Sequence, residues 1–312
     1  MDSTTASYIG IAQTYPCCIS SNPDQAHTTA PMLTDDRTHG DRPRIHQEDL
    51  RFRSLRAGNR RSGPSRRGDA GHDDPPILAA TIYSPADAVP ARVPGGPSLP
   101  GLIVGHGAGS NRRRHAGFAT AACAAGMVVM TIDFRGHGES TGELDGPLES
   151  DVLAAVALLR SHPLVDWNRI CYRGSSMGGF YGLRAAPDAG FAALALLCPA
   201  DERVLLPGLT TRPTQDELSG RGLAVRIDVD GLRAYLESCE TLNDAGDIET
   251  PVLLVHARGD AVVPLENSLT LAAALAGPTD LVILAGGDHG SAQASPAING
   301  RVIRWLVERT SP

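Results

Sequence analysis

Two observations predict an α/β fold with a mostly parallel sheet. From Leu99 onward, short apolar runs of strand length alternate with stretches of helical periodicity. This alternation is typical of βαβ units, in which a helix returns the chain to the next parallel strand. In addition, a Gly-x-Ser-x-Gly motif at residues 174–178 lies where one expected strand ends and a helix begins. No internal repeat points to another architecture.

Each element can be placed in order along the chain. Two strands are expected first, over residues 49–54 and 77–83, paired antiparallel around a Gly-, Arg-, Asp- and Pro-rich loop at 56–76. The strands of the parallel part are Gly101–Gly105, Met127–Phe134, Arg169–Arg173, Ala192–Leu197, Pro251–His256 and Leu281–Leu284. The helices between them are Ala116–Ala125, Leu148–Arg160, Gly178–Ala186, Glu266–Ala276 and Ala297–Glu308.

Two intervals fall outside this pattern. Residues 1–45 have few aliphatic side chains and no periodicity, so they predict a disordered tail before a folded domain at 46–312. Residues 199–248 combine a Pro-, Gly- and Thr-rich start, an alternating stretch at 225–229 and a short helix around Leu232–Ser238. This second interval predicts a small cap inserted into the domain.

The basic residues exclude several chemistries. All 28 of them are arginine, and the 312-residue chain contains no lysine. Schiff-base aldolases, pyridoxal-phosphate enzymes, Walker-A nucleotide sites and serine–lysine dyads all need a lysine ammonium group. We therefore expect none of these chemistries here.

Net charge, cysteine spacing and hydropathy indicate where the protein is located and which partners it binds. The net charge of −7 argues against a general nucleic-acid binder. Six cysteines are present without zinc-ligand spacing, and three of them sit in apolar runs as small buried residues would. No apolar run reaches the length of a membrane span, and no signal peptide is recognisable. We expect a cytoplasmic protein without metal or cofactor that binds neither nucleic acid nor membrane.

The motif at 174–178 predicts a nucleophile at Ser176. A strand that turns sharply into a helix crowds its neighbours, which explains the glycines on either side. Ser176 would project above the sheet near a helix N-terminus. Ser175 fits less well as the centre of the motif. The positions two residues before and after it, where the motif requires glycine, are Arg173 and Met177.

A serine nucleophile needs a base, and the base needs an orienting carboxylate. Only His256 and His289 follow Ser176 in the chain. His289 lies in a glycine-rich loop after the last strand, where a base can reach over the sheet, whereas His256 ends a strand that looks buried. Asp260, on the loop after the preceding strand, is the candidate acid, with a simple turn-forming role as the alternative. Asp288 is too close in sequence to His289 to orient its ring.

The loop after the first parallel strand predicts an oxyanion hole. Its sequence, His106-Gly107-Ala108-Gly109, is suited to backbone donors, and the N–H groups of Ala108 and Met177 are the candidate pair. Dinucleotide binding fails on spacing, because the glycine that G-x-G-x-x-G requires at position 110 is Ser110. For His106 we favour a structural hydrogen-bonding role.

These motifs together resemble the serine-hydrolase branch of the α/β-hydrolase superfamily. The similarity covers about residues 48–312 and lies in His106–Gly109, Asp133–Ser140, Gly174–Gly179 and the pairs Gly259-Asp260 and Asp288-His289. The resemblance implies an α/β-hydrolase catalytic domain that carries out acyl transfer through Ser176, His289 and Asp260. The expected cap is similar to that of feruloyl- or cinnamoyl-esterase-type members, while the Asp133–Ser140 motif also occurs in aminopeptidase-like relatives.

The arginines Arg112, Arg113 and Arg114 follow the oxyanion loop directly. One of them could bind a substrate carboxylate or phosphate as a planar fork, although a charge run is more often a solvated surface.

The sequence thus predicts a serine hydrolase that cleaves a carboxylic ester of a small-molecule acyl substrate through an acyl-enzyme intermediate. Thioester and amide substrates would use the same residues, so thioesterase and exopeptidase activities stay open. A non-catalytic ligand-binding module is the alternative of another class, and it is disfavoured because such proteins normally lack a triad residue, whereas all three occur here in order.

Overall fold

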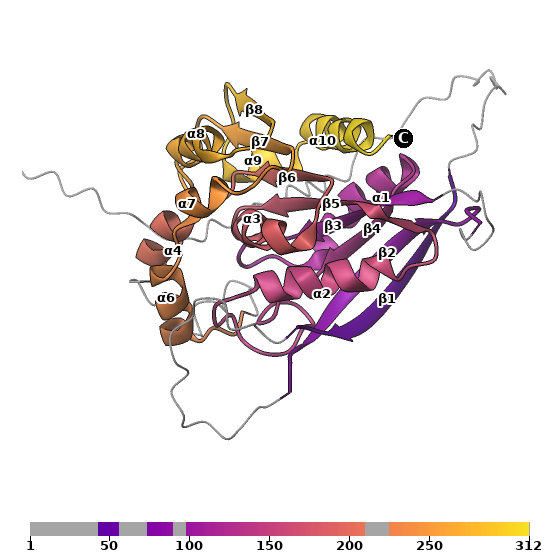
Figure 1. Ribbon diagram of the computed structural model, residues 1–312, viewed down its shortest axis with the longest axis horizontal. Helices are drawn as coiled ribbons and strands as arrows, with labels where there is room; N and C mark the ends of the chain where they lie inside the picture. Colours follow the sequence, from indigo (N-terminus) through magenta and orange to yellow (C-terminus); the bar gives the residue numbers. More distant parts are fainter. Residues whose placement is uncertain (1–42, 56–73, 90–97, 210–224, 312) are drawn as a thin grey trace, which may run out of the picture.

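An eight-stranded sheet forms the centre of the computed structural model, which describes residues 43–55, 74–89, 98–209 and 225–311 (Figure 1). The strand order is β1-β2-β4-β3-β5-β6-β7-β8. β2 pairs antiparallel with β1 and β4, and all other neighbours are parallel. The bounds are β1 (Ile45–Arg53), β2 (Ile77–Pro85), β3 (Leu99–Gly105), β4 (Val128–Ile132), β5 (Val165–Ser175), β6 (Ala193–Leu197), β7 (Val252–Ala257) and β8 (Thr279–Leu284). The predicted fold class is confirmed.

The burial of the strands follows their place in the sheet. β4 and β6 lie inside the sheet and are buried at every position, as expected for strands covered by helices on both faces. β1 lies at one edge and is largely exposed, with charged residues such as Glu48 and Asp49. Charges on an edge strand oppose its pairing with another sheet.

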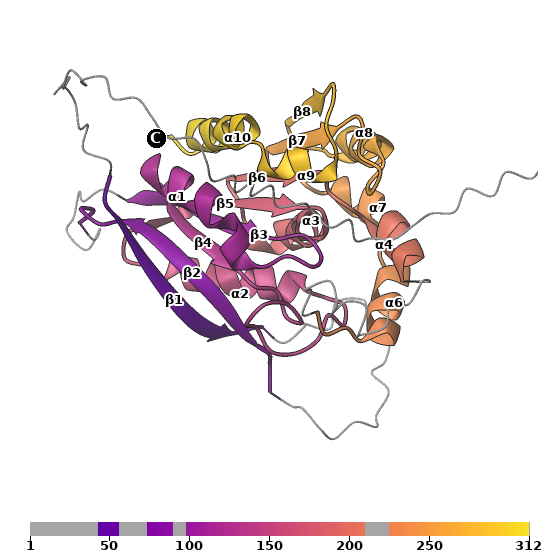
Figure 2. The same cartoon turned by 180° about the vertical axis from the view of Figure 1, so that it is seen from behind.

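Alternate residues of the strands enter two hydrophobic clusters, one on each face of the sheet. On β5, Tyr172 belongs to the cluster under α2 (Glu149–Arg160), α3 (Met177–Ala189) and α8 (Leu265–Ala274). Its neighbour Cys171 belongs to the cluster under α1 (Ala116–Ala124) and α10 (Pro296–Arg309). Figures 1 and 2 show the molecule from opposite sides. The five predicted helices are confirmed, with ends that differ by a few residues.

In the interval between β6 and β7, where the sequence predicts a cap, the described residues form three helices. They are α4 (Glu202–Gly208), α6 (Val229–Glu237) and α7 (Thr241–Ala245), which lie together beside one end of the sheet (Figure 1). The alternating stretch expected to run to Val229 is wrong at that residue, because Asp228 caps a helix there by accepting a hydrogen bond from Gly231 N at 3.0 Å. Leu232 and Leu236 of α6 pack into the core.

The expected tail falls outside the described residues as far as position 42, and Ile45, its last residue, already begins β1. Most of the loop expected at 56–76 also lies outside them. Among the helices that the structure describes, none has the length and apolar character to cross a bilayer.

Candidate active site

Ser176 occupies a one-residue turn between β5 and α3. β5 ends at Ser175 and α3 begins at Met177, so the predicted strand–turn–helix context of the motif is confirmed. Ser176 has φ 51° and ψ −118°, a backbone conformation that residues with a side chain rarely adopt. Its N–H donates to Leu197 O on β6 at 2.9 Å, which ties the strained turn to the neighbouring strand.

The glycines of the motif are required by close backbone contacts. A Cβ atom at Gly174 would lie 2.5 Å from Gly178 O, and one at Gly178 would lie 2.5 Å from His106 O. Neither distance is sterically possible, so the turn can form only with glycine at both positions. The second contact also shows that the helix after Ser176 packs directly on the loop after β3.

That loop lies over the candidate nucleophile. A Cβ atom at Gly107 would come within 3.3 Å of Ser176 Cβ. Ala108, the next residue, is exposed. Met177 is the first residue of α3, and the first N–H groups of a helix have no acceptor within it. The two candidate oxyanion donors therefore come from the segments that flank Ser176.

His106 holds the shape of this loop. The ring is fully buried: its Nε2 accepts a hydrogen bond from Phe134 N at 3.1 Å, so Nδ1 carries the proton and donates to Gly107 O at 2.8 Å. Burial lowers the pKa of His106 to about 4. The neighbouring ring of His137, 5.0 Å away between centroids, is also buried, and its pKa falls to about 3 for the same reason. The two neutral rings brace the loop.

Asp260 is a buried carboxylate with several hydrogen-bond donors around it. Oδ1 accepts from the backbone N–H groups of Val262 and Val263, both at 2.9 Å. Oδ2 lies 2.7 Å from His289 Nδ1. Burial alone would raise the pKa of Asp260, but the hydrogen bonds from His256 and His289 outweigh it and hold the pKa well below its usual range. The group is therefore a stable anion that faces an imidazole.

His289 begins a helix and does not lie within a loop, which corrects the expectation for this segment. The helix is α9 (His289–Ala294), and Asp288 caps it by accepting from Ser291 N at 2.8 Å. The capping role explains why Asp288 does not orient the histidine ring beside it. The His289 side chain is 15% exposed, so the ring is held on one side by Asp260 and remains accessible.

The predicted residues thus come together in part. Asp260 and His289 are in direct hydrogen-bond contact, at the ends of β7 and β8. In the part of the chain that the structure describes, no hydrogen bond joins Ser176 Oγ to His289. The lack of this hydrogen bond does not exclude His289 as the base, because catalytic hydrogen bonds are often long before substrate binds.

His256, the alternative base, is fully buried with both ring nitrogens engaged. Nδ1 lies 2.6 Å from Ser268 Oγ and Nε2 lies 2.9 Å from Val263 O, with Asp260 Oδ2 3.4 Å from the same nitrogen. Cys198 is buried beside them, and its ligand atom lies within 4.8 Å of those of His256 and Asp260. The three could present ligands to a metal ion, but the hydrogen bonds already made by His256 favour a role in supporting Asp260. Sequence reasoning did not identify His256 as a support of Asp260, although it lies near the end of a strand and four residues before the acid.

Two of the three arginines after the oxyanion loop, offered by the sequence as possible substrate-binding residues, form ion pairs within the protein. Arg112 is only 3% exposed, and its guanidinium contacts Asp133 at 2.5 Å and Glu139 at 3.0 Å. Arg113 contacts Glu139 at 2.7 Å. The ion pairs bury the guanidinium of Arg112 in the protein, whereas the side chains of Arg113 and Arg114 are exposed.

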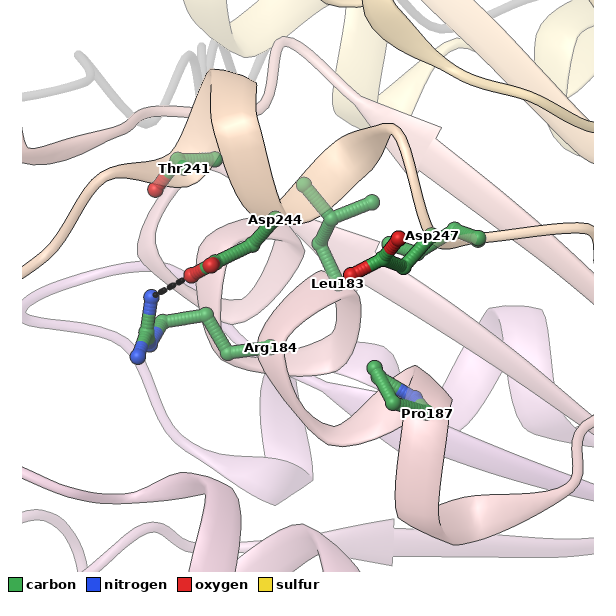
Figure 3. A pocket seen from close by; sticks show the side chains of 7 residues that line it. Leu183, Arg184, Pro187, Thr241, Asp244 and Asp247 are labelled. Carbon is green, nitrogen blue, oxygen red and sulfur yellow. Dashed lines mark hydrogen bonds and ion pairs between the residues drawn. The ribbon is translucent and has the colours of Figure 1, made fainter. Parts of the chain in front are cut away.

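A hollow lies away from these residues, between α3 and α7 (Figure 3). Its volume is about 130 Å³, and Arg184 on its wall forms an ion pair with Asp244 at 2.9 Å. None of the candidate site residues lines it. It is therefore a separate feature of the surface.

Solved structures and relatives place this architecture among known proteins. Hypothetical protein PA2218 from Pseudomonas aeruginosa superposes with a TM-score of 0.63 and 18% identity, over 90% of this chain and 100% of that one. Acetyl xylan esterase 1 from Thermoanaerobacterium sp. JW/SL YS485 superposes with a TM-score of 0.58 and 18% identity, over 86% and 89%. In sequence, uncharacterized protein Rv2307c of Mycobacterium tuberculosis is 27% identical over 215 residues, 69% of this chain and 70% of its own.

Fold and comparisons together define the class as a serine hydrolase of the α/β-hydrolase fold. Within this class, the family model of the prolyl oligopeptidase family (Peptidase_S9) matches residues 115–311, well over half of the chain. The chain therefore belongs to the prolyl oligopeptidase family.

Proposed function

We propose that this protein hydrolyses carboxylic esters through Ser176 as nucleophile, His289 as general base and Asp260 as the orienting acid. The observation that carries the proposal is the 2.7 Å contact between Asp260 Oδ2 and His289 Nδ1. Because Nδ1 donates to the carboxylate, Nε2 is left without a proton and can accept one from a serine hydroxyl.

The proposed reaction has two steps. His289 Nε2 takes the proton of Ser176 Oγ as this oxygen attacks the ester carbonyl, and the imidazolium then protonates the leaving alcohol. Water, deprotonated by the same nitrogen, next attacks the acyl-enzyme, the bond from the acyl carbon to Ser176 Oγ breaks with release of the acid, and the imidazolium returns its proton to Ser176 Oγ. Asp260, held ionised by its hydrogen bonds, stabilises the imidazolium in both steps.

The backbone N–H groups of Ala108 and Met177 are proposed to bind the oxyanion. The loop over Ser176 is braced by His106, so these donors would be in place before the reaction starts. Each such donor contributes about 3 kcal/mol to transition-state binding.

The test is labelling with a fluorophosphonate, which reacts with activated serines. We expect the wild type and Ser175→Ala to be labelled and Ser176→Ala to remain unlabelled. Ser175 is the matched control, because it is adjacent but fully buried. Labelling of Ser176→Ala at the wild-type rate would overturn the assignment.

Peptidase activity is the second candidate, because the matched family is that of prolyl oligopeptidase. The same three residues would cleave an amide by the same steps, so only the preferred substrate distinguishes a peptidase from an esterase. Turnover of p-nitrophenyl acetate, a fatty acyl-CoA and an aminoacyl p-nitroanilide by the same preparation distinguishes esterase, thioesterase and exopeptidase. We expect the ester to have the highest kcat/KM.

A further inference from the structure

Arg173, three residues before Ser176 on β5, is an arginine in the interior of the protein. It is fully buried, and in the part of the chain that the structure describes it forms no ion pair with a carboxylate. Burial lowers its pKa to about 10, so the guanidinium remains a cation at neutral pH. A buried cation without a counter-ion is expensive, and its stability depends on the neutral groups that surround it.

One partner of Arg173 is the end of the helix that begins with His289. Nη2 donates to Gln293 O at 2.9 Å. Gln293 lies next to the last residue of α9, where backbone carbonyls lack partners within the helix and where the helix dipole favours a cation. A six-residue helix is too short to be stable without such contacts. Asp288 caps its start, and Arg173 holds its end.

The second partner lies beside the oxyanion loop. Nη1 is 3.0 Å from Nδ1 of His115, the last residue of the short 3₁₀ helix η1 (Arg112–His115). An arginine can only donate, so this nitrogen of His115 accepts and the ring is neutral. Burial and the charge of Arg173 lower the pKa of His115 well below its usual value, in agreement with this arrangement. The Phe118 ring faces the guanidinium at 4.8 Å and adds a cation–π contact.

Arg173 therefore joins three segments: β5, which leads to Ser176, the segment after the oxyanion loop, and α9, which begins with His289. We propose that Arg173 is a positioning residue that fixes α9, and with it His289, to the strand that leads to Ser176. The proposal rests on the function proposed above. It assigns to a buried side chain the alignment of a base and a nucleophile that lie more than a hundred residues apart in sequence.

The test compares Arg173→Met with Arg169→Met. Arg169 lies on the same strand and likewise donates to a carbonyl at the end of a helix, Thr310 O at 2.9 Å after α10, but away from the site. With p-nitrophenyl acetate we expect Arg173→Met to lower kcat about a hundredfold, the cost of a misplacement of roughly 1 Å, with KM nearly unchanged. Hydrogen exchange of the amides at 289–294 should accelerate in this variant alone.

A conservative variant covers the case in which the Met variant does not fold. Arg173→Lys keeps the charge but can reach only one of the two acceptors, so we expect an intermediate kcat and faster exchange in α9. Wild-type kcat and exchange in a folded Arg173 variant would overturn the proposal, and so would an equal loss in Arg169→Met. Failure of the wild type to react with the fluorophosphonate would overturn the proposed function instead, while the exchange of α9 would still report on the contact.

Discussion

Gly259 and Gly287 bring the loops after β7 and β8 into direct backbone contact. A Cβ atom at Gly259 would lie 2.6 Å from Gly287 O, so the loop that carries Asp260 and the loop that leads into His289 touch where no side chain can fit. The same two loops lead to the 2.7 Å contact between Asp260 Oδ2 and His289 Nδ1.

Gly259→Ala should therefore separate the two loops. We expect kcat for an activated ester to fall about a hundredfold, because a shift of roughly 1 Å misplaces the base. Gly286→Ala is the matched control, since a Cβ at this glycine would meet nothing within 4 Å. Equal kcat values for the two variants would show that the loop contact does not position the base.

Asp260→Asn and Asp288→Asn separate the roles of two carboxylates near His289. Asn at 260 keeps the shape but favours the wrong tautomer of the histidine, and we expect kcat to fall about 10⁴-fold. Asn at 288 can still cap α9, so its kcat should stay within about threefold of wild type. Steady-state kinetics of both variants check this, and a large loss in Asp288→Asn alone would reverse the assignment of the acid.

The stability of the protein should fall as the pH drops below neutrality. The pKa values of buried His106 and His137 are lowered from 6.5 to about 4 and about 3, so their contribution is complete above pH 6.5 and is lost as the pH falls towards these values. In this range the unfolded chain binds protons that the folded chain does not. Each histidine then removes about 1.4 kcal/mol of unfolding free energy per pH unit.

Urea unfolding of wild type and His137→Gln from pH 7.5 to 4.5 measures this effect. Burial raises the pKa of Asp145 and Glu149, and these groups act in the opposite direction, so the difference between the two proteins isolates one histidine. The variant should have the shallower slope. Identical slopes would contradict the burial of a neutral His137.

Arg112→Met should destabilise the fold far more than Arg114→Met. The first change leaves Asp133 buried without its counter-ion, which costs about 3–5 kcal/mol. The second changes an exposed side chain and should stay within about 0.5 kcal/mol. Urea midpoints that coincide would mean that the buried ion pair does not support the loop.

The sequence predicted the fold where apolar patterns extended over whole elements. Buried strands such as β6 were recognisable as continuous apolar runs, and the longer helices by apolar residues at helical spacing. α9 was not, because six residues are too few for a periodic pattern and its stability comes from contacts at both ends.

Part of the candidate site could likewise be predicted from the sequence, and part could not. Ser176 and His289 stood in local motifs, so they could be proposed as nucleophile and base without a structure. The partners of Arg112 and Arg173 were hidden because they depend on tertiary contacts, in one case with a backbone carbonyl 120 residues away. The sequence alone does not show whether a charged side chain faces solvent or the interior.

The order of the strands has a consequence for biosynthesis. Ser176 follows a strand in the middle of the sheet, whereas Asp260 and His289 follow the last two strands, β7 and β8. At about 5–20 residues per second, the ribosome exposes the serine strand several seconds before the proposed base. Until β7 arrives, β6 has an open edge, and the nascent chain carries the proposed nucleophile without its proposed base. On the proposed mechanism, hydrolytic activity therefore appears only when the final strands join the sheet.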